Sequence, residues 1–227
     1  MIKNRRFAFW FRILAAIGCL LGILAQLDLH NGQFIATQML YFTFQTNLLT
    51  FVLFVALAIR TGIDKRKNGI KGSAHYFYKF YGTILTSMIL VSVVFWVAIA
   101  PAVWDSPEIR TYGNFATHLL HLILLIADYI MFSEAGRLTK FDPLWFLIYP
   151  VTYTIQAGIL GVFDVRYYTP FSDGSYWAPY PFLDWSRFGA LTLFMILGIG
   201  FVVFGMGYLF FLIDKKIAQK QQKTRNR

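Results

Sequence analysis

Two stretches of this sequence carry polar side chains at helical spacing within otherwise apolar segments. In YFTFQTNLLT, Thr43, Asn47 and Thr50 recur at i, i+4 and i+7, so they share one face of a helix. In NFATHLLHLILLIADYI, His118 and His121 are three residues apart and also share a face. A hydroxyl beside an imidazole suits nucleophilic catalysis, because the imidazole accepts the hydroxyl proton while the oxygen attacks a carbonyl. The first candidate chemistry is therefore acyl transfer.

The elements that must position these residues are membrane-spanning helices. Hydrophobic residues make up 57% of the 227 residues and charged residues only 14%, and the mean hydropathy is +0.54, which excludes an ordinary soluble domain. Runs of ~20 apolar residues can cross a hydrocarbon core of roughly 30 Å as helices. Six such runs lie near 7–27, 38–59, 80–103, 114–133, 143–163 and 188–213. We predict an all-α, polytopic, integral membrane protein with six transmembrane helices, in the cell membrane if its source is prokaryotic.

The distribution of basic residues predicts the orientation. Of the 21 lysines and arginines, 18 fall on one side of the predicted spans, and Arg110, Arg166 and Arg187 fall on the other. Short cytoplasmic loops hold an excess of these residues, so both termini are predicted to be cytoplasmic. Attraction to anionic membrane lipids accounts for the net charge of +10, and no nucleic-acid partner is expected. We divide the chain into a transmembrane domain over 1–213 and a basic, frayed cytoplasmic tail over 214–227.

The predicted depths of the polar residues favour a site near the non-cytoplasmic surface. At 1.5 Å per residue, Thr43 lies roughly 8 Å and His121 roughly 10 Å below that surface, so the two can share a level. Asp128 lies about 10 Å below His121, too far to orient its ring. For Asp128 three interpretations stay open: a buried pair with a cation such as Arg12, a proton relay, or a neutral acid.

Each candidate also has a structural alternative. The Thr43 face could serve only to join helices by hydrogen bonds. His118 and His121 could bind a metal, but zinc needs three or four ligands and the only other histidine on that side is His30. We therefore expect no metal and no cofactor.

The fifth span and the loop after it supply candidate substrate contacts. The loop, residues 163–189, is crowded with tyrosine, phenylalanine and tryptophan, which either settle at the lipid headgroups or form a lid. Arg166 or Arg187 could neutralise a substrate carboxylate or could anchor the loop. The candidates for substrate contact are Gln156, Arg166, Tyr180 and Arg187.

Four motifs in order resemble a known family. YFTFQTN, HLLH, WFLIYPVTY and PYPFLDW, within residues 35–200, are similar to motifs of the androgen-induced-gene (FAR-17a/AIG-like) family of transmembrane threonine hydrolases, especially its prokaryotic branch of Pr6Pr membrane proteins. The resemblance implies cleavage of fatty acid esters of hydroxy fatty acids by one threonine and one histidine. It places the nucleophile on Thr43 and the histidine on His121. His118 matches a further family histidine, and YPFLD, residues 180–184, matches a landmark without an assigned role.

The leading hypothesis is a membrane esterase acting on a lipid-like ester at the level of the outer leaflet. Thr43 attacks the acyl carbonyl, and His121 is general base and then general acid. His118, Asn47 or Gln45 orients His121 or stabilises the oxyanion. The expected partners are the lipophilic ester substrate and membrane lipids.

The alternative is a small-solute or proton-coupled transporter, or a sensor, that uses a stripe of His118, His121 and Asp128. A non-catalytic scaffold is a third reading.

Overall fold

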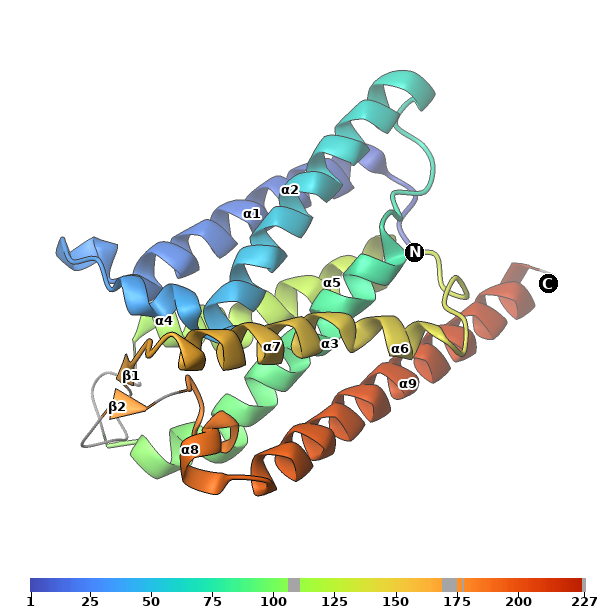
Figure 1. Ribbon diagram of the computed structural model, residues 1–227. Helices are drawn as coiled ribbons and strands as arrows, with labels where there is room; N and C mark the ends of the chain where they lie inside the picture. The colour runs from blue at the N-terminus through green and yellow to red at the C-terminus, as the bar shows by residue number, and fades with distance from the viewer. Residues whose placement is uncertain (106–110, 169–174, 177, 226–227) are drawn as a thin grey trace.

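In the described part of the computed structural model, six helices are long and apolar enough to cross a membrane. The structure describes residues 1–105, 111–168, 175–176 and 178–225. The six candidate spans are Arg5–Gln26, Phe42–Asn68, Tyr78–Ile99, Tyr112–Phe132, Asp142–Val162 and Leu191–Lys223. Each overlaps one of the six apolar runs in the sequence. The predicted six-span helical fold is therefore confirmed (Figure 1).

The spans are divided into regular and irregular helical segments. In chain order the elements are α1 (Arg5–Gln26), η1 (Leu29–Asn31), η2 (Ala36–Leu40), α2 (Phe42–Asn68), α3 (Tyr78–Val93), η3 (Val94–Ile99), η4 (Ala100–Val103), α4 (Tyr112–Phe115), η6 (Ala116–Leu120), α5 (His121–Phe132), α6 (Asp142–Phe146), α7 (Ile148–Val162), β1 (Tyr167–Tyr168), β2 (Ser175–Tyr176), η7 (Pro181–Leu183), α8 (Trp185–Phe188) and α9 (Leu191–Arg225). The segments η3 and η6 are π-helical, and β1 pairs antiparallel with β2.

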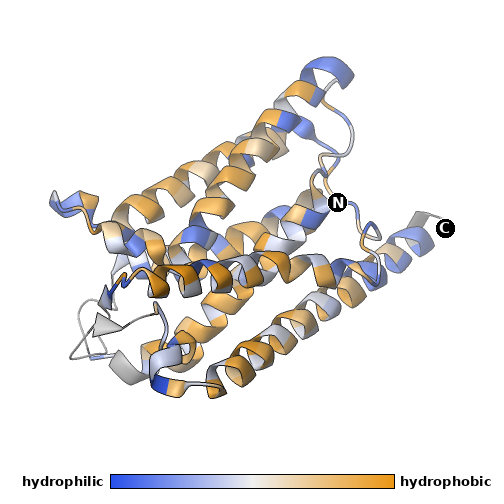
Figure 2. Ribbon diagram, in the orientation of Figure 1, coloured by the Kyte–Doolittle hydropathy of each residue, from blue (hydrophilic) through white to orange (hydrophobic). Residues whose placement is uncertain are grey.

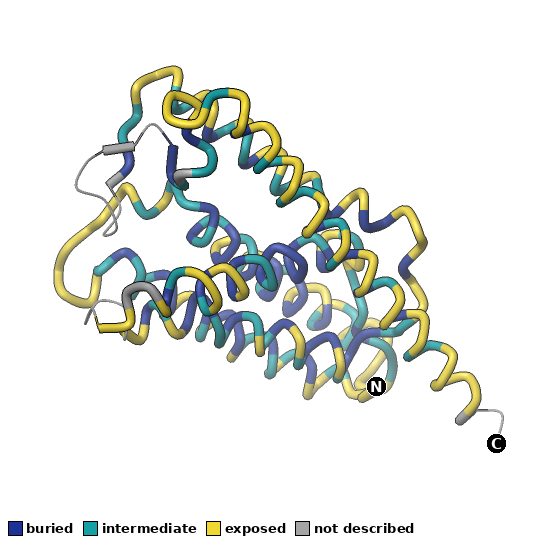
Figure 3. Tube along the Cα trace, turned by 90° about the horizontal axis from the view of Figure 1, so that it is seen from below, coloured by how far each residue is buried: buried dark blue, intermediate teal, exposed yellow. Residues whose placement is uncertain are grey.

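The last helix differs from its prediction. The tail over 214–227 was expected to be frayed, but α9 continues as a helix to Arg225. At 1.5 Å per residue its 35 residues extend about 52 Å, well beyond the roughly 30 Å of a hydrocarbon core. Asp214, the first residue assigned to the tail, is buried and belongs to the bundle. Hydrophilic residues follow it towards the C-terminus (Figure 2), and much of α9 is exposed (Figure 3).

The core lies between α1, α2, α3 and α5. The helices α1 and α2 pack antiparallel, and α5 contacts both α1 and α3 (Figure 1). Apolar side chains from these helices are almost completely buried: Cys19, Leu53, Phe54, Leu57, Ile84, Met88 and Leu125. The ring of Phe146 in α6 fits against glycines of two neighbouring helices, since a Cβ on Gly82 or Gly207 would lie 2.4 or 2.8 Å from it. These glycines let α6 approach α3 and α9 closely.

The two termini lie at the same end of the bundle (Figure 1), here called the basic end. Arg5 organises the loop that follows α2, because its guanidinium donates to the carbonyls of Asn68, Gly69, Lys71 and Ser73. Gly72 in that loop has φ +137° and an added Cβ would meet the Arg5 guanidinium, so glycine is needed there.

Asp214 ties α9 to the loop after α5. One carboxylate oxygen accepts a hydrogen bond from the Tyr129 hydroxyl, and the other accepts the N–H groups of Gly136 (2.9 Å) and Leu138 (3.3 Å). Nearby, His75 Nδ1 accepts the N–H of Glu134 at 2.8 Å. A backbone N–H can only donate, so Nδ1 carries no proton in this contact. The basic end is thus held together by side chains that bond to loop backbone.

Acidification is expected to destabilise this end through His75. Burial lowers the pKa of His75 below its usual 6.5; nearby Glu134 and Asp214 oppose this shift, whereas Arg137 and Arg12 reinforce it. The unfolded chain therefore takes up the proton first, and the free energy of unfolding falls as the pH drops below about 6.5. The slope stays below about 1.4 kcal/mol per pH unit, since one group exchanges at most one proton.

Denaturant unfolding of the purified protein between pH 7 and 5 measures this effect. His75→Gln should have a shallower pH dependence than the wild type. The matched control is His30→Gln, because the His30 side chain is 58% exposed. Equal pH slopes for the wild type and His75→Gln would contradict the role of this contact.

Candidate functional site

The N-terminus of α2 positions Thr43. Tyr41 is extended (φ −83°, ψ 144°), and the first backbone bond of the helix runs from the Gln45 N–H to the Tyr41 carbonyl. The Tyr41 side chain does not cap the helix. The Phe42 ring fixes the first turn by stacking on Tyr149 at 4.9 Å and meeting Tyr153 edge-on at 5.0 Å. Thr43 is consequently the second residue of a well-anchored helix.

Asn47 connects this turn to the two histidines. Its side chain is fully buried, and Nδ2 donates to the carbonyls of Thr43 (2.7 Å) and Thr117 (3.1 Å). With the amide nitrogen facing two acceptors, Oδ1 must be the atom that faces His121 Nδ1. The hydrogen-bond network therefore assigns the proton of His121 to Nδ1 and leaves Nε2 with a lone pair.

His121 faces the neighbouring helix α1 with that second nitrogen. The ring is fully buried, and Nε2 has no hydrogen-bond partner among the described residues. An added Cβ on Gly22 would lie 2.6 Å from Nε2, so glycine makes room for the imidazole. The histidine that the family resemblance selects is thus held between Asn47 and α1.

His118 has different surroundings. It lies in the π-helical turn η6, where Nδ1 is 2.9 Å from the Asn114 carbonyl, and its ring stacks on Phe95 of the π-helical turn η3 at 3.7 Å. Because a carbonyl only accepts, Nδ1 carries the proton and Nε2 is free to accept one. His118 is 7% exposed, and no described residue bonds Nε2. π-Helical turns of this kind are frequent at functional sites.

Thr43 and His118 both line an apolar cavity of about 120 Å³. It lies between α2, α3, η3, η6, α7, η7 and α9, at the end opposite the basic end. Its polar lining residues are Thr43, His118, Tyr153, Thr154 and Tyr180. Its apolar lining residues are Phe42, Leu90, Val91, Val94, Phe95, Ile99, Pro150, Phe182, Leu183 and Ile199. Of the two histidines of HLLH, only His118 contributes to this described lining.

Tyr180 lines the cavity beside Thr43. Its hydroxyl lies near the Thr43 side chain and near the backbone of Phe42 and Thr43. The ring stacks on Phe182 at 5.5 Å and meets Tyr41 edge-on at 6.0 Å. Burial raises the pKa of Tyr180 above its usual value, so the phenol stays protonated. This part of the aromatic loop forms part of the cavity wall.

The remaining loop aromatics have varied positions. Tyr167 is fully buried and meets Tyr41 edge-on at 5.9 Å, whereas Trp185 is exposed. Tyr167 therefore packs inside the protein and Trp185 does not. Phe171 and Trp177 lie outside the described residues.

The other residues predicted to support catalysis or to contact the substrate are not among the described residues that line the cavity. Gln45 donates to the Met39 carbonyl at 3.2 Å, and Arg166 Nε pairs with Asp164 at 2.6 Å. Arg187 is exposed in α8, and Gln156 is half-buried in α7. Of the four residues proposed for substrate contact, Tyr180 is the one that lines the cavity within the described structure.

The YPFLD landmark gains a structural role. Asp184 is the N-cap of α8, and its Oδ1 accepts the Ser186 hydroxyl (2.5 Å) and the Arg187 N–H (3.3 Å). An aspartate followed by a short helical turn is a recognisable capping pattern, so the sequence held the signal. The Phe95 stack on His118 carried no comparable signal, because it joins residues of two spans.

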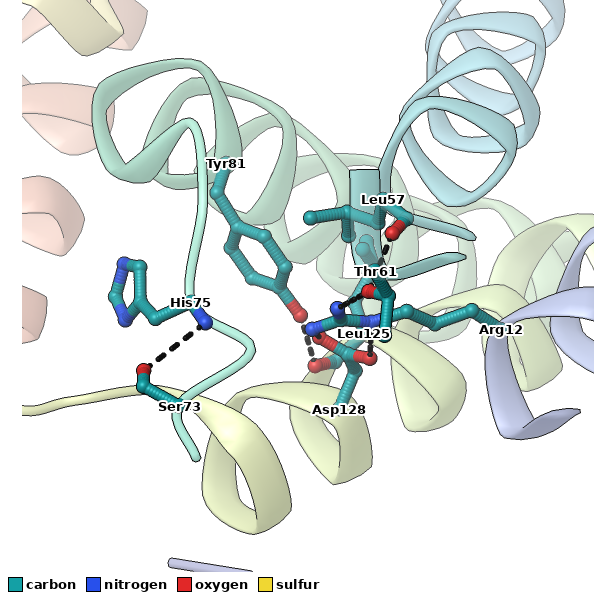
Figure 4. A network of polar contacts seen from close by, with 8 residues as sticks. All are labelled: Arg12, Leu57, Thr61, Ser73, His75, Tyr81, Leu125 and Asp128. Atoms are coloured by element: carbon teal, nitrogen blue, oxygen red, sulfur yellow. Dashed lines mark hydrogen bonds and ion pairs between the residues drawn. The ribbon is translucent and has the colours of Figure 1, made fainter. Parts of the chain in front are cut away.

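Asp128 pairs with Arg12, which confirms one of its three open interpretations. Arg12 Nε and Nη2 contact the two carboxylate oxygens at 2.7 and 3.0 Å, and Nη1 donates to the Thr61 hydroxyl at 2.6 Å (Figure 4). Beside the pair, Tyr81 donates to the Leu125 carbonyl at 2.5 Å. Arg12 and Asp128 are 1% and 0% exposed. Their charges are therefore satisfied within the protein.

Comparison with known proteins identifies no relative. Family models, curated proteins and solved structures gave no match to the chain. Among the described residues, no group of three or more His, Cys, Asp or Glu side chains is arranged to hold a metal ion. The site must therefore be interpreted from its own geometry.

Proposed function

We propose that this protein is a membrane-embedded esterase that hydrolyses a lipid-like ester through an acyl-threonine intermediate on Thr43. The ester is a fatty acid ester of a hydroxy fatty acid or a related lipophilic ester. The observation that carries the proposal is the apolar cavity in which the Thr43 side chain and the buried His118 imidazole share one lining. A nucleophile, a base with a free lone pair and an apolar surrounding support acyl transfer on a hydrophobic substrate.

In this proposal His118 is the general base. As Thr43 Oγ1 bonds to the carbonyl carbon, its proton passes to His118 Nε2 and the carbonyl π electrons move to the carbonyl oxygen. The tetrahedral intermediate then expels the alcohol, which takes the proton from His118. A water molecule loses its proton to His118 and attacks the acyl carbon. Thr43 leaves, recovers that proton, and the carboxylic acid is released.

His121 has a positioning role in this scheme. The resemblance assigns the catalytic histidine to His121, but the cavity geometry favours His118. His121 bonds to Asn47 of α2, and Asn47 also bonds to the Thr117 carbonyl of η6. This link holds the turn that bears His118 against the helix that bears Thr43.

The orientation of the chain is part of the proposal. With both termini cytoplasmic, the basic end faces anionic inner-leaflet lipids and the cavity lies near the outer leaflet. A lipophilic ester would reach Thr43 from the bilayer, and water would come from the external surface. In a prokaryote this membrane would be the cell membrane.

The transporter alternative receives less support from the geometry. A proton or solute pathway through His118, His121 and Asp128 needs groups that are free to exchange protons or ligands. Both carboxylate oxygens of Asp128 instead accept hydrogen bonds from the Arg12 guanidinium. The paired carboxylate favours a structural role at this position.

Hydrolysis of a p-nitrophenyl acyl ester by detergent-purified histidine variants tests the proposal. His118→Ala should lower kcat by about 10²–10⁴-fold, the usual contribution of a general base, and added imidazole should restore part of the activity. His121→Ala should have a smaller effect that imidazole does not reverse, together with a lower Tm. His30→Ala is the matched control.

Two outcomes would count against this account. Loss of activity in His121→Ala with full activity in His118→Ala would move the base to His121. A well-folded wild type that neither hydrolyses such esters nor reacts with fluorophosphonate probes would contradict the esterase proposal itself.

A further inference from the structure

The first turn of α2 presents backbone donors to the cavity. Phe42 and Thr43 are the first two residues of a helix of 27 residues, and N–H groups at these positions have no acceptor within a helix. Both residues line the cavity, and the Tyr180 hydroxyl lies near the backbone of both. A phenol oxygen therefore lies beside the first turn of α2, at a place where a ligand oxygen would fit.

We propose that the N–H groups of Phe42 and Thr43 form the oxyanion hole of the site, and that the Tyr180 hydroxyl occupies this hole until a substrate carbonyl displaces it. The inference rests on the proposed esterase function and adds the residues that stabilise its transition state. The ligand class is the carbonyl oxygen of an ester, which becomes an oxyanion during attack.

The position of the nucleophile favours this assignment. Thr43 bears both the attacking hydroxyl and one of the two N–H groups, so a carbonyl carbon near Oγ1 holds its oxygen near the start of the helix. The positive end of the helix dipole and the apolar cavity both strengthen the stabilisation of a developing negative charge.

His118 provides an independent indication that a ligand belongs here. It is 7% exposed and lines the same cavity, and its Nε2 has no hydrogen-bond partner among the described residues. An imidazole nitrogen that reaches a cavity without a protein partner can hydrogen-bond to water or to a ligand there. It therefore marks the cavity as a place for a polar atom beside the two N–H groups.

The side-chain donors predicted for this role are engaged elsewhere. Asn47 Nδ2 donates to the carbonyls of Thr43 and Thr117, and Gln45 Nε2 donates to the Met39 carbonyl. The backbone N–H groups of Phe42 and Thr43 are donors that remain beside Thr43. During attack the carbonyl oxygen gains the π electrons, binds the two N–H groups, and returns the electrons when the alcohol leaves.

A proline substitution can remove one of these donors with little disturbance of the helix. Proline lacks the N–H and is favoured at the first position of a helix. The preceding residue must be extended, and Tyr41 already has ψ 144°. Phe42→Pro also removes the phenylalanine ring, so Phe42→Ala is the matched control that lacks the ring but keeps the N–H.

The test compares p-nitrophenyl ester hydrolysis by Phe42→Pro and Phe42→Ala in full-length protein. The proposal predicts a kcat about 10²-fold lower for Phe42→Pro, with similar KM and Tm for the two variants, because the lost bond forms in the transition state. Equal kcat values for Phe42→Pro and Phe42→Ala would overturn the proposed oxyanion hole. If the wild type is active in the same assay, the esterase function is not contradicted by that result. An inactive wild type would overturn both.

Tyr180→Phe is a second test that leaves α2 unchanged. Without the hydroxyl the two N–H groups are vacant at rest, so kcat/KM and the rate of fluorophosphonate labelling should exceed those of the wild type. A large fall in kcat at unchanged Tm would contradict the proposal, because it would make the phenol itself the stabilising donor.

Discussion

Thr43→Val is expected to lower ester hydrolysis by about 10⁴-fold or more, since removal of a covalent nucleophile leaves only binding and oxyanion stabilisation. Valine keeps the branched shape at Cβ, so the first turn of α2 and its aromatic contacts should persist. The measurement is kcat for a p-nitrophenyl acyl ester, with Tm and size-exclusion profile as checks on folding.

Thr50→Val is the control for this prediction. Thr50 lies on the same face of α2, and its hydroxyl bonds to the Thr46 carbonyl within the helix. The Thr50 variant should keep its activity, and Thr43→Ser should keep part of it because a hydroxyl remains. Wild-type activity in Thr43→Val would refute the acyl-threonine mechanism.

Arg12→Met is expected to lower the free energy of unfolding by about 3–5 kcal/mol, because it leaves the Asp128 carboxylate buried without its partner. Both carboxylate oxygens accept from Arg12, and the pair is almost completely buried. Asp128→Leu should lower the free energy of unfolding by a similar amount, because it leaves the Arg12 guanidinium buried without its partner. Denaturant titration of the purified protein in detergent measures both changes.

The double variant Arg12→Met, Asp128→Leu is the informative control. Apolar groups of similar volume can replace a buried pair with little net cost, so the double variant should recover most of the lost stability. It should also keep esterase activity, since the pair is outside the cavity lining. Loss of activity in a stable double variant would favour the transporter or sensor alternative.

The spans were predictable from the sequence because each is a long apolar run, whereas their ends depend on local contacts. The second span was expected from residue 38, but Tyr41 is extended and the helix begins at Phe42. The last helix continues past residue 213 because Asp214 is held by Tyr129, Gly136 and Leu138. These contacts come from α5 and the loop after it, so no local pattern indicates them.

The residues of the candidate site could be selected from the sequence, but their geometry could be predicted only in part. Helical spacing placed Thr43 and Asn47 on one face, where Asn47 does bond to the Thr43 carbonyl. The same spacing placed His118 and His121 together, but it could not indicate that the rings face different neighbours. The π-helical turn η6 and the Phe95 stack set the direction of His118, and both are tertiary features.

The measurement that tests the central claim most directly is identification of the residue that a fluorophosphonate probe modifies. Purified protein would be labelled in detergent, digested, and analysed by mass spectrometry. The account predicts a phosphonate adduct on Thr43 and its loss in Thr43→Val and His118→Ala. A folded protein without an adduct, or with one on another residue that survives in Thr43→Val, would contradict it.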